Sequence, residues 1–317
     1  MRSTLTALVA LSATLLACAQ PAPPPTDVEA ISFLGDTLRR PALPDDVRAR
    51  YQAALDTALS EYSRQDLTPE QAADALIWLG RRTAYLGRYR EAIDIFSEGV
   101  SRFPDDARFL RHRGHRYITV RDLDNAITDL ANAAHLINGR PDEIEPDGLP
   151  NARNTPTSTL HSNIWYHLGL AHYLKGGFEQ ALGAYQQEAA IADNPDMLVA
   201  TSWWRYLTLR RLGRDAEAEQ VLEPISDSMD IIENQSYHKL LLLAKGVIPA
   251  DSVLASLGSG DAPADAAVQY GLGAWYLLGG NEERADSLFR DLVARGNWAA
   301  FGVIAAEAEL RGREQSR

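Results

Sequence analysis

Histidine and arginine side chains gather in one stretch of the sequence, and they are the residues most able to do chemistry. His112 and His115 are three residues apart, a spacing that places both on one face of a helix. Two such histidines can bind a metal ion, but Arg111, Arg113 and Arg116 stand beside them and repel a cation. Acid–base use of His115 would require a nucleophile, and the sequence pairs it with none. We therefore expect no metal site, no cofactor and no catalytic residue.

The sequence also lacks the motifs by which conventional enzymes are recognised. It contains no phosphate-binding glycine-rich loop, HExxH helix, GxSxG elbow or EF-hand loop. Its formal net charge of −12 disfavours contact with phosphate backbones, so a nucleic acid partner is not expected. With 45% apolar and 23% charged residues, the composition is that of a globular protein. These features favour a binding protein over an enzyme.

The first 17 residues predict export. Arg2 precedes an apolar run over residues 5–17 that is too short to span a bilayer and has the layout of a secretory signal. The run ends in Leu15-Leu16-Ala17-Cys18, which resembles the lipobox of bacterial lipoproteins, and Cys18 is the only cysteine. The resemblance implies cleavage after residue 17 and acylation of Cys18. With Ala19 next, it also implies an outer-membrane anchor facing the periplasm.

The next segment, residues 18–45, is rich in proline and aspartate, which predicts an extended tether with at most a marginal helix over residues 28–38. Apolar residues at helical spacing then predict a helix over residues 47–62, with Asp45 and Asp46 as candidate N-caps.

Small residues followed at fixed distances by larger ones recur through the rest of the chain. Gly80, Ala92 and Phe96 have three clear sets of counterparts: Gly114, Ala126 and Leu130; Gly169, Ala181 and Tyr185; Gly273, Ala285 and Phe289. Ala92 and Ala126 are 34 residues apart, and the later intervals fit this period once an insertion is allowed. The small residues let two helix backbones approach, and the large side chains fill the gap between neighbouring units.

A helix-turn-helix period of 34 residues resembles the tetratricopeptide repeat (TPR). Leu79-Gly80, Gly87-Arg88-Tyr89 and Pro104 match its motif in the first unit, and Trp165, Leu168-Gly169 and Phe178 match it in the third. The resemblance implies an all-α, right-handed α-solenoid of about six units over residues 46–310, with a capping helix near its end and a polar tail over 311–317. The units are expected near residues 73–106, 107–140, 162–195, 199–232, 233–265 and 266–299, with a loop inserted at 141–161.

In TPR arrays the exposed side of each unit's first helix lines a concave groove, and the register implies which residues lie there. The implied set is Arg81, Tyr85, Arg108, Arg111, His115, Asn163, Tyr166, Tyr173, Trp203, Arg210 and Arg211, joined by Arg153 from the inserted loop. Such a basic, aromatic groove suits an acidic or carboxylate-terminated protein segment. Alternatively, the arginines pair with nearby acids such as Asp74, Asp105 and Asp106 and serve solubility. The carboxylate-clamp subset uses Lys and Asn where Arg, His and Tyr stand here, so clamp-type chaperone binding is not implied.

Three hypotheses follow. The first is a lipid-anchored TPR scaffold that holds a segment of an envelope protein in the groove. The second is a small-molecule-binding, glycan-binding or hydrolytic protein that uses the inserted loop with Arg111, His115 and His167; a closed pocket in place of an open groove would favour it. The third is a structural protein that assembles with itself. The sequence leaves the oligomeric state open.

Overall fold

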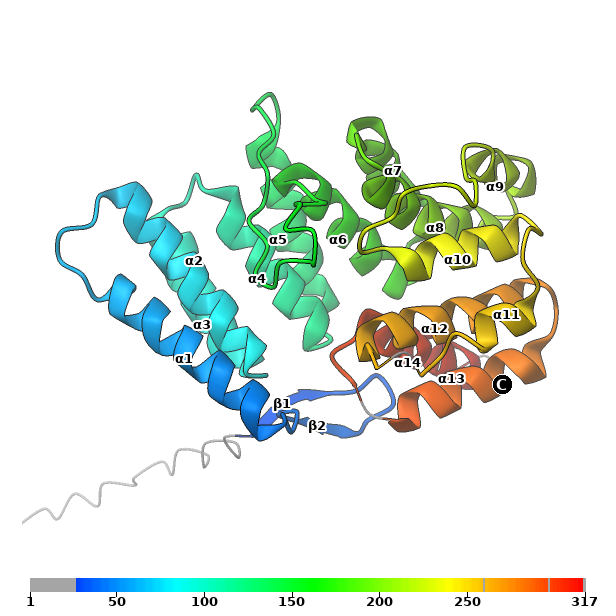
Figure 1. The fold of residues 1–317 in the computed structure, drawn as a ribbon, viewed down its shortest axis with the longest axis horizontal. Coiled ribbons are helices and arrows are strands. Elements are labelled where there is room, and N and C mark those ends of the chain that lie inside the picture. The colour runs from blue at the N-terminus through cyan, green and yellow to red at the C-terminus, as the bar shows by residue number, and fades with distance from the viewer. Residues whose placement is uncertain (1–26, 259, 296, 316–317) are drawn as a thin grey trace, which may run out of the picture.

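The computed structural model describes residues 27–258, 260–295 and 297–315; residues 1–17, Cys18 and the start of the expected tether lie outside these ranges. The described chain forms a two-stranded antiparallel sheet, β1 (Val28–Ile31) and β2 (Thr37–Arg39), followed by helices (Figure 1). They are α1 (Asp45–Tyr62), α2 (Pro69–Tyr85), α3 (Tyr89–Arg102), α4 (Ala107–Thr119), α5 (Leu123–Ile137), α6 (Leu160–Leu174), α7 (Phe178–Ile191), α8 (Pro195–Arg211), α9 (Asp215–Leu222), α10 (Gln235–Ala244), α11 (Ala250–Leu254), α12 (Ala262–Leu278), α13 (Glu282–Arg295) and α14 (Phe301–Gln315). None of these helices is both long and apolar enough to cross a bilayer.

The prediction of an all-α solenoid of TPR-like helix hairpins is confirmed. From α2 to α13, successive helices pair as hairpins, one pair for each interval of the repeat. The small residues that define the period lie where two helices touch. A Cβ atom at Gly80 would overlap the ring of Phe96, and one at Gly169 would overlap the ring of Tyr185. The spacing of small and large residues therefore reports close helix packing within each unit.

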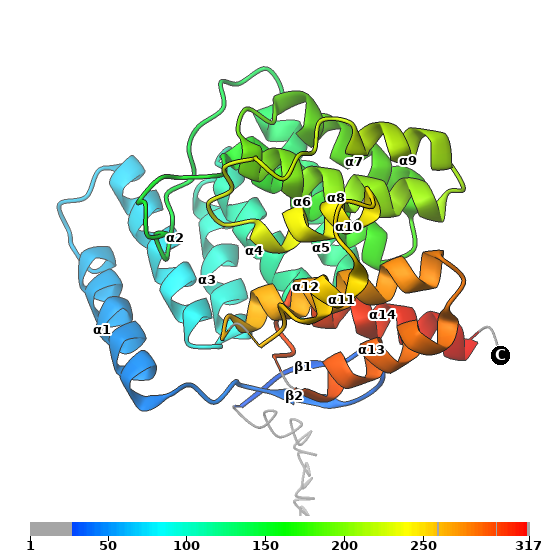
Figure 2. The same cartoon turned by 45° about the vertical axis from the view of Figure 1, so that its right-hand side comes forward.

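The chain does not remain an open arc. Its C-terminal units turn back toward the middle of the array, so that α14 packs against α12 and α13 and also reaches α6 (Figure 1; Figure 2). A buried ion pair holds this return: Arg121, in the turn between α4 and α5, donates from Nη2 to Glu307 Oε1 of α14 at 2.6 Å. The side chains of Arg121 and Glu307 are 3% and 1% exposed. The second unit is thus joined directly to the C-terminal helix.

Arg121 also occupies an unusual backbone conformation. The turn in most other units has a glycine with positive φ at this position, namely Gly87, Gly176, Gly213 and Gly280, with φ from 69° to 82°. Arg121 has φ of 68°, a region that non-glycine residues adopt at a cost of about 1 kcal/mol or more. In the second unit, Arg121 therefore takes the turn position that glycine suits, and its side chain binds Glu307.

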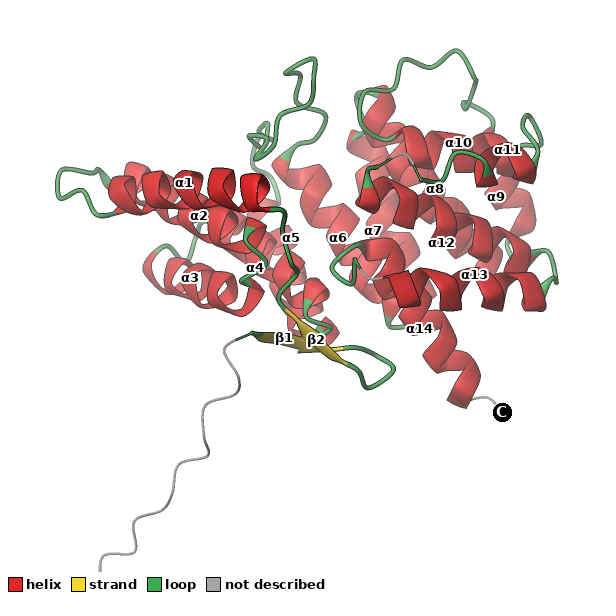
Figure 3. Ribbon diagram, turned by 60° about the horizontal axis from the view of Figure 1, so that its bottom comes forward, coloured by secondary structure: helices red, strands yellow, loops and turns green. Residues whose placement is uncertain are grey.

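The expected tether and marginal helix are wrong for residues 27–40, which form the hairpin of β1 and β2 between the N-terminal helices and α13 and α14 (Figure 3). The hairpin is bound on both sides. Glu29, 2% exposed, accepts a hydrogen bond from the backbone N–H of Arg90, and the N–H of Phe33 donates to Glu307. The composition of residues 18–45 could not reveal that this part of the chain would form strands and find partners on the body.

Two smaller expectations also fail at the ends of the helical body. The N-cap of α1 is Pro44, and Asp45 and Asp46 lie within the first turn, where negative charge is favourable. The polar tail expected over residues 311–317 is helical as far as Gln315, because Arg313 binds Asp286 of α13 at 2.7 Å and extends the packing of α14.

Candidate functional site: a cationic cavity beneath the inserted loop

Residues 141–159, which we call the strap, contain no helix or strand and hold only one isolated bridge, between Ile144 and Thr159. The strap connects α5 to α6 along the chain, and it contacts α2 with one part and the segment that follows α9 with another. At the first end, Arg81 and Arg82 donate to the backbone carbonyls of Pro146 and Gly148 at 2.8 and 2.9 Å. At the other end, Arg153 binds Asp230 at 2.7 Å, and Asn151 and Thr157 bind Glu233. The strap therefore covers the face that α2, α4 and α6 line.

A cavity of about 220 Å³ remains between the strap and these three helices. Charged and polar side chains form most of its wall: Arg81, Tyr85, Arg111, His112, His115, Arg116, Glu145, Asp147, Ser158 and Asn163. Five of them, Arg81, Tyr85, Arg111, His115 and Asn163, belong to the set expected from the sequence. The structure brings these five together around one partly open cavity beneath the strap, where the sequence predicted an open groove.

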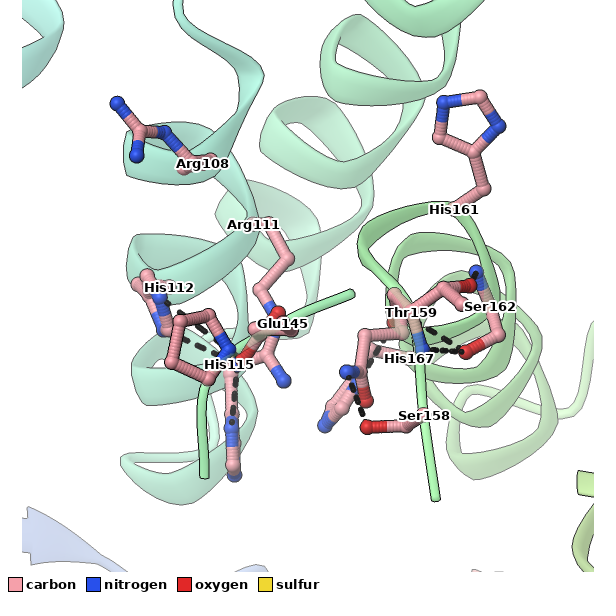
Figure 4. Close-up of polar contacts among 12 residues, drawn as sticks. Arg108, Arg111, His112, His115, Glu145, Ser158, Thr159, His161, Ser162 and His167 are labelled. Atoms are coloured by element: carbon pink, nitrogen blue, oxygen red, sulfur yellow. Dashed lines mark hydrogen bonds and ion pairs between the residues drawn. The ribbon is translucent and has the colours of Figure 1, made fainter. Parts of the chain in front are cut away.

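Arg111 and Glu145 form the buried centre of the site (Figure 4). Arg111 Nε lies 2.9 Å from Glu145 Oε2, with the two side chains 8% and 11% exposed. Neither atom makes a well-directed hydrogen bond in the structure, although their separation defines an ion pair. Arg111 Nη1 also contacts Nδ1 of His112 at 3.1 Å and Nδ1 of His115 at 3.4 Å. Burial lowers the pKa of Arg111, and the Glu145 carboxylate offsets part of that effect.

The histidines of the site are neutral at neutral pH. Burial, reinforced by the neighbouring arginine charges, holds the pKa values of His112, His115 and His167 well below 6.5. The rings of His115 and His167 lie 4.4 Å apart, and Phe301 of α14 packs 5.1 Å from His115. Since Arg111 already contacts the Nδ1 atoms of His112 and His115, these rings serve as its acceptors. Among the described residues there is no group of three metal-ligating side chains.

Arg116 differs from the other cations of the cavity. Among the described residues, its guanidinium has no ion pair and no hydrogen bond, and its Cζ lies 5.5 Å from the ring centroid of Tyr89. Burial without a carboxylate lowers its pKa to about 10, so Arg116 remains charged at neutral pH. A desolvated guanidinium with free donors favours an anion beside it.

The cavity as a whole is positive. Arg81, Arg111 and Arg116 face two carboxylates, Glu145 and Asp147. Burial and the charge of Glu233 raise the pKa of Asp147, which weakens its negative contribution. The three neighbouring histidines add no compensating negative charge. The site therefore has at least one cation more than its own residues neutralise.

The remaining expected site residues lie elsewhere. Arg108 points away from the cavity and pairs with Asp74 and Asp106, as the solubility alternative proposed (Figure 4). Tyr166 shares a hydrogen-bond network with Tyr237 and Trp204. The expectation of an exposed position is wrong for Tyr173 and Trp203, which are buried in the core because α12 and α14 return over them. Three arginines bind carboxylates outside the cavity: Arg153 pairs with Asp230, Arg210 with Asp215 and Arg211 with Glu309.

The groove set expected from the sequence omitted three residues that line the cavity: His112 and Arg116, which the sequence had singled out only as a histidine pair with arginines beside it, and Glu145. His112 and Arg116 are four residues apart and thus share one face of α4, a spacing that could have marked them. Glu145 lies in the inserted loop, and no periodicity indicates where a loop residue will point.

No family model matches the sequence, and no curated protein matches it. Among solved structures, a tetratricopeptide repeat protein from Parabacteroides merdae is similar at 14% identity and a TM-score of 0.49, covering 83% of this chain and 93% of its own. YrrB, described as a TPR protein with an unusual peptide-binding site, has 14% identity and a TM-score of 0.40, covering 81% and 98%. MamA AMB-1 has 15% identity and a TM-score of 0.41, covering 63% and 90%. At these identities, no ligand of those proteins can be transferred to this chain.

Proposed function

We propose that the chain is a helical-repeat binding scaffold that accepts an anionic group of a partner protein in the cavity beneath the strap. Arg116 carries this proposal, because it is a partly buried cation with no hydrogen-bond or ion-pair partner among the described residues, in a cavity that two further arginines line. Guanidinium groups bind carboxylates through paired, charge-assisted hydrogen bonds, so a carboxylate of a protein side chain or chain end is the best complement.

A second candidate function is binding of a small free carboxylate. The small volume of about 220 Å³ favours it, since this volume lies below that of usual drug-sized pockets, roughly 300 to 1,000 Å³. A single acidic side chain or a small organic acid would fill such a space. The two candidates share one chemistry and differ in whether the carboxylate belongs to a polypeptide.

The location of this scaffold is also a proposal. The signal-like residues 1–17 and the lipobox-like run ending at Cys18 support export and lipid anchoring, on an outer membrane facing the periplasm. Labelling cells with an alkyne fatty acid and isolating the chain tests the anchor. The wild-type chain should carry the label and the Cys18→Ser variant should not. Equal labelling of both would contradict acylation at Cys18.

Binding is tested by selecting from a display library of acidic peptides with the wild-type chain and with Arg116→Gln. Recovered peptides are then titrated by calorimetry, with glutarate as the small-carboxylate probe. Arg116→Gln should lose about 2 kcal/mol or more, roughly 30-fold in Kd, because it removes a desolvated charge contact. Arg284→Gln is the matched control, since Arg284 is exposed and stacks on Tyr276 away from the cavity. Ligands that bind wild type and a folded Arg116→Gln variant equally would contradict the proposed site.

A further inference from the structure

The strap places a short acidic segment of the chain directly on the cationic cavity. Residues 143–147 read Glu-Ile-Glu-Pro-Asp, and three of them meet the site. The Glu145 carboxylate reaches Arg111, the Pro146 carbonyl accepts from Arg81, and Asp147 lines the cavity. These are the contacts expected of an extended acidic peptide bound between arginines.

The fit of this segment is incomplete in its polar contacts. Arg111 Nε and Glu145 Oε2 are buried beside each other without a well-directed hydrogen bond. The attraction between the two charges therefore does not fully offset the free energy that it costs to remove them from water. Arg116 receives no acceptor from the strap among the described residues. An external segment that supplied a carboxylate to Arg116 as well as to Arg111 would satisfy the site better than the strap does.

The apolar contacts of the segment are incomplete too. Ile144 and Leu149, on either side of the cavity contacts, are 64% and 55% exposed. The far end of the strap depends partly on the ion pair of Arg153 with Asp230, whose side chains are 52% and 73% exposed. Exposed pairs of this kind contribute about 0–1 kcal/mol. This anchor of the strap is therefore weak.

We infer that the strap is an internal stand-in for the partner, and that the site recognises an extended acidic segment of the same kind as residues 143–147. The partner competes with the strap for Arg81 and Arg111 and additionally binds Arg116. This inference rests on the proposed function and specifies the partner as an acidic stretch of polypeptide. The apparent affinity of the site is its intrinsic affinity multiplied by the fraction of molecules in which the strap does not occupy the site.

The probe is a fluorescent peptide with the sequence of residues 141–151, titrated into the full chain by anisotropy. Glu145→Gln in the chain should bind it about tenfold tighter than wild type, because Arg111 then lacks a carboxylate until the peptide supplies one. Glu143→Gln is the matched control on the strap, where the side chain is exposed, and it should bind as wild type does. A peptide carrying Glu145→Gln should bind neither chain.

A second variant loosens the strap without changing any charge. A Cβ atom at Gly148 would overlap the Tyr85 hydroxyl and approach Arg81, so Gly148→Ala pushes the strap away from α2. This variant should also bind the peptide more tightly. In the wild-type chain, saturating peptide should speed trypsin cleavage after Arg153, because displacement of the strap frees this side chain from Asp230.

The outcomes separate the two proposals. Tighter binding by both variants together with faster cleavage supports the stand-in role. If Glu145→Gln and Gly148→Ala bind the peptide no more tightly than wild type, the stand-in role is refuted, whatever library peptides bind. If library peptides bind through Arg116 but the strap peptide does not bind at all, the claim that the partner resembles residues 143–147 is refuted and the proposed function stands. If no acidic peptide and no glutarate binds any variant, both fail.

Discussion

Glu188 of α7 offers the sharpest test of the energetics of this fold. Its side chain is 2% exposed, and its Oε2 atom has no hydrogen-bond partner in the structure. Burial raises the pKa of this carboxyl from 4.5 to about 8, with the Thr201 hydroxyl acting in the opposite direction. At pH 7, Glu188 is therefore protonated in the folded chain and ionised in the unfolded chain.

The sign and size of the pH effect follow from these two pKa values. Below pH 4.5 both states hold the proton, so the ionisation of Glu188 costs nothing. As pH rises, only the unfolded state loses its proton, and the cost grows to about 1 kcal/mol at pH 5, about 3 at pH 7 and about 4 at pH 8. It levels off once the folded state ionises near pH 8. Glu188→Gln mimics the protonated carboxyl and removes this cost.

Urea unfolding of wild type and Glu188→Gln at pH 5, 7 and 8 measures the effect. Any loss from burying the extra N–H of glutamine is the same at each pH, so the variant should gain about 3 kcal/mol on wild type between pH 5 and 8. Glu179→Gln, at the exposed start of the same helix, is the matched control and should show no such trend. A difference between wild type and Glu188→Gln that stays constant from pH 5 to 8 would show that Glu188 ionises normally and refute the reasoning.

Two further predictions concern the junction between α4 and α14. The pKa values of His112, His115 and His167 are depressed, so their contribution to stability is present above pH 6.5 and is lost as pH falls below it. Together they should remove up to about 4 kcal/mol between pH 7 and 5.5, measured by urea unfolding in the Glu188→Gln background, and a flat profile there would contradict their neutral state. Arg121→Gly relieves the positive-φ strain but leaves Glu307 buried without its cation, for a net loss of about 2–4 kcal/mol; a thermal melt matching or exceeding wild type would show that the ion pair does not hold the return of α14.

The repeat could be predicted from the sequence because it depends on local geometry. Gly80 and Phe96 meet within one helix hairpin, so the same spacing must recur wherever the same contact is made. The closure of the array depends instead on contacts across 186 residues, such as that of Arg121 with Glu307. The one local signal of closure is a residue that does not fit: Arg121 stands where the turns of most other units have glycine.

The site was predictable to the same extent. Helix register correctly grouped Arg81, Tyr85, Arg111, His115 and Asn163, since these residues lie on helices whose exposed sides turn toward one space. It misplaced Trp203 and Tyr173, because register assigns a side chain to a face but cannot tell whether a later unit covers that face. The strap contact of Glu145 with Arg111 has no periodic signature and could come only from the folded chain.

The closure and the insertion together determine where a ligand can bind. An open solenoid would offer its whole concave face to a partner, but here α12 and α14 cover the C-terminal part, and the strap covers the N-terminal part. Because of these two covers, the residues expected to line one long basic groove lie instead in the core, in surface ion pairs, or around the cavity beneath the strap. In the cavity beneath the strap, Arg116 makes no ion pair or hydrogen bond with any described residue. Because the strap leaves Ile144 and Leu149 exposed and is held at its far end partly by an exposed ion pair, access to Arg116 should be governed by the strap, while the Arg121–Glu307 pair keeps the helical cover in place.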